Sequence, residues 1–159
     1  MRITIISVGR IKEKFLAEAV KEYTKRLSKY CKLYEEVVPD ERADDNYSAA
    51  EIEQVKLKEG QKILNKVPKN SYVVALDISG TQLSSEDFSK KINALSLEGK
   101  SDITFIIGSS NGLWEEVTNN ADFKLSFSKM TFPHQLFKVI LLEQIYRAFK
   151  INAGETYHK

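Results

Sequence analysis

The stretch Thr104-Phe105-Ile106-Ile107-Gly108-Ser109-Ser110-Asn111-Gly112 decides the fold of this chain. Its mostly apolar first half is typical of a strand buried on both faces, and the glycines that follow it predict an abrupt turn. A second strand is expected over 123–127, and the loop over 128–134 that follows leads into a very apolar helix. Loops at the carboxyl ends of parallel strands expose backbone donors and acceptors at one edge of a sheet, so the two loops predict a small-molecule site.

Strand and helix patterns alternate along the rest of the chain. Apolar runs predict strands at about 3–8, 32–38, 72–77, 103–107 and 123–127. Apolar residues at helical spacing predict helices at about 15–27, 49–66, 85–97, 113–119 and 136–150. Ser48 with Glu51, and Ser84 with Asp87, fit the side-chain caps that open two of these helices. Strands separated by helices imply a parallel sheet, so the expected fold is a single-domain α/β parallel-sheet sandwich.

The composition is that of an ordinary globular protein. Of the 159 residues, 42% are hydrophobic and 29% are charged, and uncharged apolar stretches such as 139–142 are far too short to cross a membrane. The N-terminus lacks the pattern of a signal peptide, so we expect a cytoplasmic protein. Cys31 is the only cysteine, which excludes an internal disulfide, and with only His134 and His158 beside it no metal site is expected.

Charge is segregated along the chain, although the net charge is only +2. Residues 2–32 carry nine Lys or Arg against three Glu, whereas residues 35–53 carry eight acidic residues against one Arg. Clustered cations attract polyanions at long range, so the basic segment suits a nucleic-acid partner. A solvated helix face explains the same pattern, and both interpretations stay open.

The last helix is apolar on nearly every side. A helix of this kind must be covered all round, and one sheet covers only one side of it. The pattern therefore predicts a homodimer with this helix in the interface. Arg147 lies within the helix, and we expect it to reach a carboxylate, a carbonyl or an RNA phosphate, so that structural pairing and RNA contact both stay open.

A serine hydrolase is one interpretation of the glycine-rich turn. The turn matches the G-x-S-x-G pattern between a strand and a helix, with Ser110 as the nucleophile, and Asp122 and His134 follow in the order of a catalytic triad. We favour a turn that only brings backbone amides near a ligand, because the pattern is short and an oxyanion-loop signature is missing. The glycine patterns of dinucleotide and nucleoside-triphosphate sites are also missing.

Several short sequences together resemble a known enzyme family. They are Leu76-Asp77, Ile106-Ile107-Gly108 with Gly112, Thr131-Phe132-Pro133-His134, Glu143-Gln144-Ile145-Tyr146-Arg147-Ala148 and Tyr157-His158. The set resembles the SPOUT-class methyltransferases that methylate N3 of a pseudouridine in large-subunit ribosomal RNA. The resemblance covers residues 1–159 as one SPOUT methyltransferase domain. It implies a trefoil knot in the C-terminal half and a homodimer whose two subunits complete each active site, with the assembled ribosome as the expected substrate.

The resemblance also implies the cofactor S-adenosylmethionine and a set of site residues. The implied cofactor contacts are Leu76, Gly108, Phe127, Ser128, Lys129, Met130, Thr131 and Phe132. The implied catalytic residues are His134, Arg147, Tyr157 and His158, with either histidine as the candidate base. A non-catalytic RNA-binding accessory protein stays open as an alternative.

The chain departs from the family pattern in two places. The family loop commonly reads Gly-Gly-Pro-x-Gly, and here Ser109 and Ser110 replace the second glycine and the proline. The family tail often ends in Tyr-His-Arg, and here Lys159 replaces the arginine. Lysine keeps the charge but lacks the planar fork that grips phosphate, so we expect altered RNA affinity.

Overall fold

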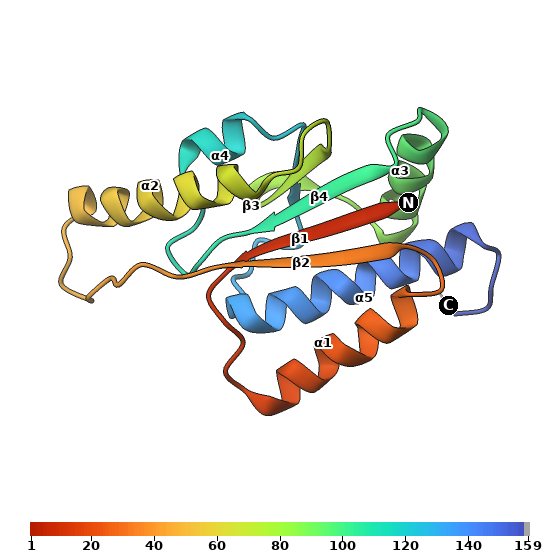
Figure 1. The fold of residues 1–159 in the computed structure, drawn as a ribbon, viewed down its shortest axis with the longest axis horizontal. Coiled ribbons are helices and arrows are strands. Elements are labelled where there is room, and N and C mark those ends of the chain that lie inside the picture. The colour runs from red at the N-terminus through yellow and green to blue at the C-terminus, as the bar shows by residue number, and fades with distance from the viewer. Residues whose placement is uncertain (158–159) are drawn as a thin grey trace.

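Five parallel strands form the centre of the molecule in the computed structural model, which describes residues 1–157 (Figure 1). Their order across the sheet is β2-β1-β4-β3-β5. The strands are β1 (Arg2–Val8), β2 (Lys32–Val38), β3 (Tyr72–Gln82), β4 (Asp102–Ile107) and β5 (Phe123–Ser126). The predicted α/β parallel sheet is confirmed, and the trefoil knot stays a prediction.

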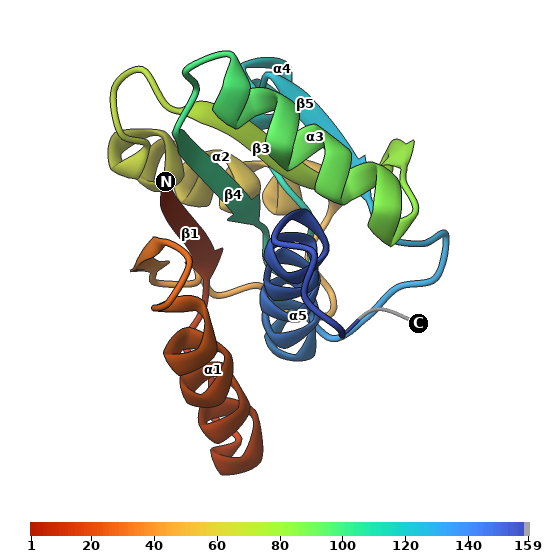
Figure 2. The same cartoon turned by 90° about the vertical axis from the view of Figure 1, so that its right-hand side faces the viewer.

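Helices cover both faces of this sheet. The helices α1 (Lys14–Leu27), α3 (Ser85–Leu97) and α5 (His134–Asn152) lie on one face, and α2 (Ala49–Lys66) and α4 (Glu115–Asn119) lie on the other (Figures 1 and 2). Helix α5 lies between α1 and α3 and contacts both. This double cover explains why the central strands are apolar on both sides.

Two hydrophobic cores result, one on each face. In β4, Phe105 and Ile107 belong to the core beneath α1, α3 and α5, whereas Ile106 belongs to the core beneath α2 and α4. In β1, Ile5 and Ile6 divide in the same way, because successive side chains of a strand point to opposite faces. The side chains of Ile5, Ile6, Phe105 and Ile106 are fully buried.

The predicted helix caps are present. The hydroxyl of Ser48 accepts the backbone N–H of Glu51 at 3.2 Å, and the Glu51 carboxylate accepts the N–H of Ser48 at 3.3 Å. Ser84 accepts the N–H of Asp87 at 3.0 Å. Each contact satisfies a donor that the first helical turn leaves free, so these two helix starts are encoded locally.

Strand β3 is longer than predicted, and the difference lies beside the later site. The strand continues to Gln82, and its pairing with β5 shifts between Leu76 and Thr81, so that 77–80 forms a bulge. Gly80 lies against the backbone of β5, where an added Cβ would stand 2.7 Å from the carbonyl of Lys124. The alternation of apolar residues that predicted this strand ends at Asp77. The sequence pattern therefore did not predict that the strand continues beyond it.

Helix α5 begins at His134, two residues before the predicted start, and α4 begins at Glu115, two residues after it. The side of α5 that faces the sheet is fully covered. The other side is not covered, because Leu136 remains 36% exposed and Ile140 is only half-buried. The helix is therefore not enclosed within one chain.

Two properties of the described residues bear on function classes. No helix within residues 1–157 is both long and apolar enough to span a membrane. In the same part of the chain, no three His, Cys, Asp or Glu side chains are grouped so that they could hold a metal ion.

Candidate functional site

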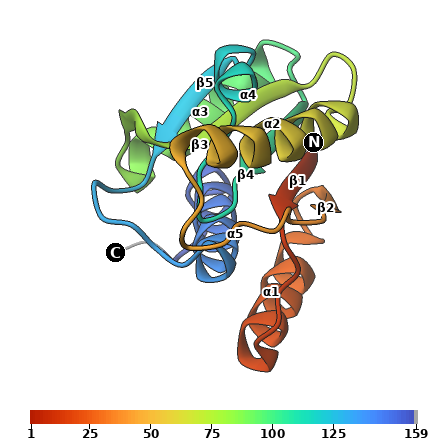
Figure 3. The ribbon, with the colours of Figure 1, turned by 90° about the vertical axis from the view of Figure 1, so that its left-hand side faces the viewer.

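A cavity of about 880 Å³ lies at the carboxyl ends of β3, β4 and β5. Because β3 lies between β4 and β5 in the sheet, the segments that leave these strands are neighbours. The start of α5 closes another side, and the β5–α5 loop swings away from the body before it returns (Figures 2 and 3). A cavity therefore lies at the carboxyl edge of the sheet where the sequence predicts a site, and β3 joins the two strands expected there.

Most of the predicted cofactor contacts line this cavity, and so does one predicted catalytic residue. The exception among the cofactor contacts is Lys129, which is exposed in the β5–α5 loop. The lining residues from the prediction are Leu76, Gly108, Phe127, Ser128, Met130, Thr131, Phe132 and His134.

The β5–α5 loop is held in place by its own short contacts. The hydroxyl of Ser128 accepts the N–H of Met130 at 2.9 Å, and the Ser126 hydroxyl donates to the Ser128 carbonyl at 3.1 Å. The rings of Phe127 and Phe132 flank Phe137 of α5, with centroids 5.0 and 6.0 Å away. This packing gives the cavity an aromatic wall.

The β4–α4 turn forms the opposite wall. Ser109 and Gly112 form a one-pair antiparallel bridge, in which the Gly112 N–H donates to the Ser109 carbonyl at 2.9 Å. Gly112 has φ +84°, a conformation that favours glycine. At Gly108 an added Cβ would stand 3.0 Å from Gly112 and from Leu113. The tight turn therefore favours glycine at both positions, and it brings backbone close to the cavity.

The lining combines apolar side chains with charged ones. Leu76, Leu113 and the aromatic wall provide the apolar surface, and Asp77 and Glu115 add carboxylates. Glu53 also lines the cavity, but it pairs with Lys56 at 3.3 Å. Such a mixture suits a ligand with a flat apolar ring and a cationic group, because the ring gains from burial and the cation from nearby negative charge.

The catalytic triad of a serine hydrolase is not assembled. Asp122 lies at the amino end of the sheet, where its carboxylate accepts the N–H of Val73 at 2.7 Å. Ser110 follows the carboxyl end of β4, so the length of the strand, roughly 20 Å, separates the two groups. The sequence order of the three residues matched a triad, but the sheet places them at opposite edges.

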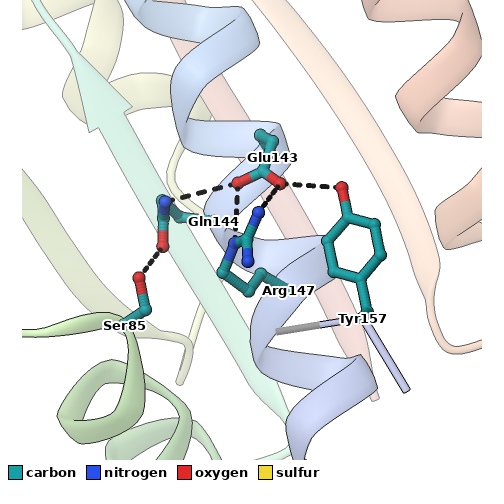
Figure 4. A network of polar contacts seen from close by, with 5 residues as sticks. All are labelled: Ser85, Glu143, Gln144, Arg147 and Tyr157. Atoms are coloured by element: carbon teal, nitrogen blue, oxygen red, sulfur yellow. Dashed lines mark hydrogen bonds and ion pairs between the residues drawn. The ribbon is translucent and has the colours of Figure 1, made fainter. Parts of the chain in front are cut away.

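Arg147 and Tyr157 belong to a different cluster on α5 (Figure 4). The guanidinium of Arg147 donates to the Glu143 carboxylate at 2.8 and 3.3 Å, and the Tyr157 hydroxyl donates to the same carboxylate at 2.9 Å. Gln144 connects the cluster to α3 by accepting the hydroxyl of Ser85 at 2.7 Å. Of the three partners predicted for Arg147, the structure shows the carboxylate.

This cluster lies far from the cavity within one chain. His134 and Arg147 are separated by about 20 Å along the helix axis, which is more than either side chain can span. Neither Arg147 nor Tyr157 lines the cavity. His158, the remaining predicted catalytic residue, lies outside the described residues.

The C-terminal segment packs on its own chain. Glu155 accepts the Tyr30 hydroxyl of the α1–β2 connection at 2.9 Å and pairs with Lys150 of α5 at 2.6 Å. The ring of Tyr157 lies edge-on to Tyr146, with centroids 5.1 Å apart. Hydrogen bonds from Lys150 and Tyr30 lower the pKa of Glu155 to about 2. The sequence has no burial pattern here, so this anchoring was not predicted.

A pH titration tests the Tyr157 contact. Burial and the hydrogen bond to Glu143 raise the pKa of Tyr157 to about 12, because both favour the neutral phenol. The contact therefore stabilises the folded state below the ordinary tyrosine pKa of about 10, and this contribution is lost as the pH rises through about 12. In an ultraviolet difference titration, the Tyr157→Phe variant should lack one tyrosine that ionises well above pH 10 in the wild type. Loss of one that ionises near pH 10 would contradict the contact.

Sequence reasoning missed Glu59, a buried carboxylate that contacts the β4–α4 turn. Its side chain is 2% exposed, and Ser109 donates to it at 2.9 Å. One signal was available in the sequence. Val55, Glu59 and Ile63 are spaced four residues apart, which places the glutamate in the apolar stripe of α2.

Comparison with known proteins agrees with this geometry. A family model described as predicted SPOUT methyltransferase matches residues 1–158. Relatives named ribosomal RNA large subunit methyltransferase H, from Clostridium kluyveri and Clostridium novyi, are 57% and 58% identical over 159 residues, which is 100% of each chain. A solved structure of a probable methylase family protein from Haemophilus influenzae is similar in fold, with a TM-score of 0.53 at 12% identity over 99% of this chain and 70% of the other. The protein belongs to the SPOUT methyltransferase family.

Proposed function

We propose that this protein transfers a methyl group from S-adenosylmethionine to N3 of a pseudouridine in large-subunit ribosomal RNA, with the assembled ribosome as the substrate. The observation that carries the proposal is the convergence of the β3, β4 and β5 ends on one cavity, in a chain of this family. The names of the full-length relatives support ribosomal RNA as the substrate class. Residues 1–159 then act as one methyltransferase domain in the cytoplasm, where ribosomes are found.

The cavity fits S-adenosylmethionine in size and chemistry. Leu76 and Met130 offer apolar surface for a purine, and the turn at Gly108 lets backbone groups approach its edge. Asp77 and Glu115 place negative charge in the same cavity, which suits a ligand that carries a sulfonium and an ammonium group. When bound, the cofactor supplies a methyl group that is already activated by the positive sulfur.

The chain itself contributes alignment and proton removal. Holding two reactants close together and aligned lowers the activation free energy by about 7–11 kcal/mol. The two walls of the cavity serve this purpose. N3 of the base carries a proton that must leave, and a positioned base adds about 10² to 10⁴ in rate. His134 is the candidate base, because its imidazole lines the cavity at the start of α5.

A homodimer completes the site in this proposal. Arg147 and Tyr157 cannot reach the cavity of their own chain, whereas a second subunit packed on α5 would bring its own copies there. The open side of α5 provides a surface for this contact, since Leu136 and Ile140 are incompletely covered. Phe15 on the neighbouring α1 adds a side chain that is 67% exposed.

A substitution on α5 tests the dimer. We expect the protein to sediment as a dimer at micromolar concentration, and Leu136→Asp to shift it toward the monomer, because the change places a charge in an apolar interface. Leu97→Asp is the matched control, since Leu97 is a leucine of α3 that is 81% exposed. A wild-type monomer in sedimentation velocity would contradict the proposal.

Methyl incorporation tests the function. Labelled S-adenosylmethionine should transfer its methyl group to intact ribosomes, and ribosomes that carry uridine in place of pseudouridine at the target should stay unlabelled. Isolated subunits and free ribosomal RNA show whether the whole ribosome is needed. Binding of RNA without uptake of the cofactor in calorimetry would favour the accessory-protein alternative and overturn the enzyme.

A further inference from the structure

Glu59 is a carboxylate buried in the apolar stripe of α2. It lies on α2 between Val55 and Ile63, and its side chain is 2% exposed. In the described part of the chain, both of its hydrogen-bond donors are uncharged groups. An apolar side chain of similar volume would fill the same space without the cost of burying a charge. The carboxylate therefore needs an explanation other than packing.

Its two oxygens join two loops. One oxygen accepts the Ser109 hydroxyl of the β4–α4 turn at 2.9 Å. The other accepts the backbone N–H of Glu41, in the connection between β2 and α2, at 3.0 Å. Glu41 is held in turn by Lys62 of α2 at 2.7 Å. A carboxylate is suited to this arrangement, because both of its oxygens act only as acceptors.

The first of these loops forms a wall of the site, and the second passes close to Gly9. The Ser109 carbonyl accepts the N–H of Gly112, so the contact with Glu59 fixes the turn that forms a wall of the cavity. On the other side, Asp40 precedes Glu41, and both Asp40 and His134 lie close to Gly9. A Cβ added at Gly9 would meet the His134 imidazole at 3.4 Å and Asp40 at 3.9 Å.

We propose that Glu59 is a positioning residue that holds the 108–112 turn in the conformation that binds the cofactor. The inference rests on the proposed function, and it deepens that function by naming a residue that acts from behind the cavity wall. Loss of the contact should loosen the turn and weaken cofactor binding while the fold is kept, because the exchange of the Glu59 carboxylate for an amide keeps the shape of the buried side chain.

Three variants test this proposal. Ser109→Ala removes the donor in the turn, and Glu59→Gln places an amide N–H₂ against one of the two donors. Glu36→Gln is the matched control, because it removes a carboxylate that pairs with Lys66 of α2 at 3.3 Å on the outer surface. A hydrogen bond to a charged group contributes enough that Ser109→Ala and Glu59→Gln should each weaken S-adenosylmethionine binding about tenfold in calorimetry. Glu36→Gln should leave the affinity unchanged.

A measurement on the protein without cofactor tests this inference independently of the proposed function. In the free protein, hydrogen exchange at the backbone amides of 109–112 should quicken in Ser109→Ala and Glu59→Gln but not in Glu36→Gln. If the wild type does not bind the cofactor, the proposed function fails, whereas the exchange result still reports on the turn. Exchange and affinity equal to wild type in folded Ser109→Ala and Glu59→Gln proteins would overturn the positioning role.

The pH dependence of cofactor binding gives a further test, because a residue that acts only through packing would not produce it. Burial raises the pKa of Glu59, and the nearby acids Asp40 and Glu41 raise it further, while the hydrogen bonds from Ser109 and Glu41 oppose the shift. Lys62 faces Glu41 on the same side. Protonation removes one of the two acceptors, so the affinity for the cofactor should be full at higher pH and should fall as the pH drops through the raised pKa. Glu59→Gln should remove this dependence, and a dependence that persists unchanged would contradict the role.

Discussion

Mixed His134→Ala and Arg147→Ala chains are expected to regain methyl transfer that neither variant shows by itself. His134 lines the cavity, and Arg147 lies about 20 Å further along α5, outside it. If each active site takes its cavity from one subunit and the Arg147 cluster from the other, a mixed dimer contains one site in which both residues are intact. Random exchange then restores about one quarter of all sites.

The alternative arrangement gives the opposite result. If each site used only residues of its own chain, every site of the mixed dimer would lack either His134 or Arg147, and activity would stay absent. The measurement is methyl incorporation before and after the two proteins are unfolded together and refolded. Each variant refolded alone is the control, and its activity should fall by about 10² or more, since each has lost a general base or a charge-assisted contact of the site. Unchanged activity in Arg147→Ala alone would remove that residue from the catalytic set.

Gly108→Val is expected to abolish S-adenosylmethionine binding at concentrations that saturate the wild type. A Cβ at this position already meets Gly112 and Leu113 at 3.0 Å, and the two methyl groups of valine extend further. The turn must then open, which moves the wall of the cavity and breaks the short bridge between Ser109 and Gly112. We expect a loss of affinity of more than 100-fold, because closely packed backbone does not give way without local rearrangement.

Gly108→Ala provides the graded comparison. Its Cβ requires a shift of only a few tenths of an ångström, so we expect a smaller loss of affinity than for valine. Calorimetry measures binding for both variants, and thermal unfolding shows whether the fold is kept. Equal affinity in the wild type and in Gly108→Val would show that the backbone at Gly108 does not form part of the cofactor site.

The sequence correctly predicts the helix caps and the order of the strands and helices along the chain. The capping contacts of Ser48 and Ser84, the five strands and the five helices depend on spacing and on contacts a few residues apart. The sequence also predicted that the glycine-rich turn and the β5–α5 loop lie next to each other, because both follow strands of a parallel sheet. The prediction of the cofactor contacts needed more than spacing, because it came from the family resemblance.

The tertiary structure decided which of these residues meet. The strand order brings β3 between β4 and β5, so that Leu76 joins the two loops. The parallel direction of β4 and β5 places Asp122, which precedes β5, at the opposite edge from Ser110, which follows β4. Glu59 reached the turn through the packing of α2. The sequence by itself determined the secondary structure and the class of site, because periodicity and caps act over one or two helical turns. The strand order, the contacts of Glu59 and the separation of His134 from Arg147 depend on contacts between residues distant in the chain, and no local pattern encodes them.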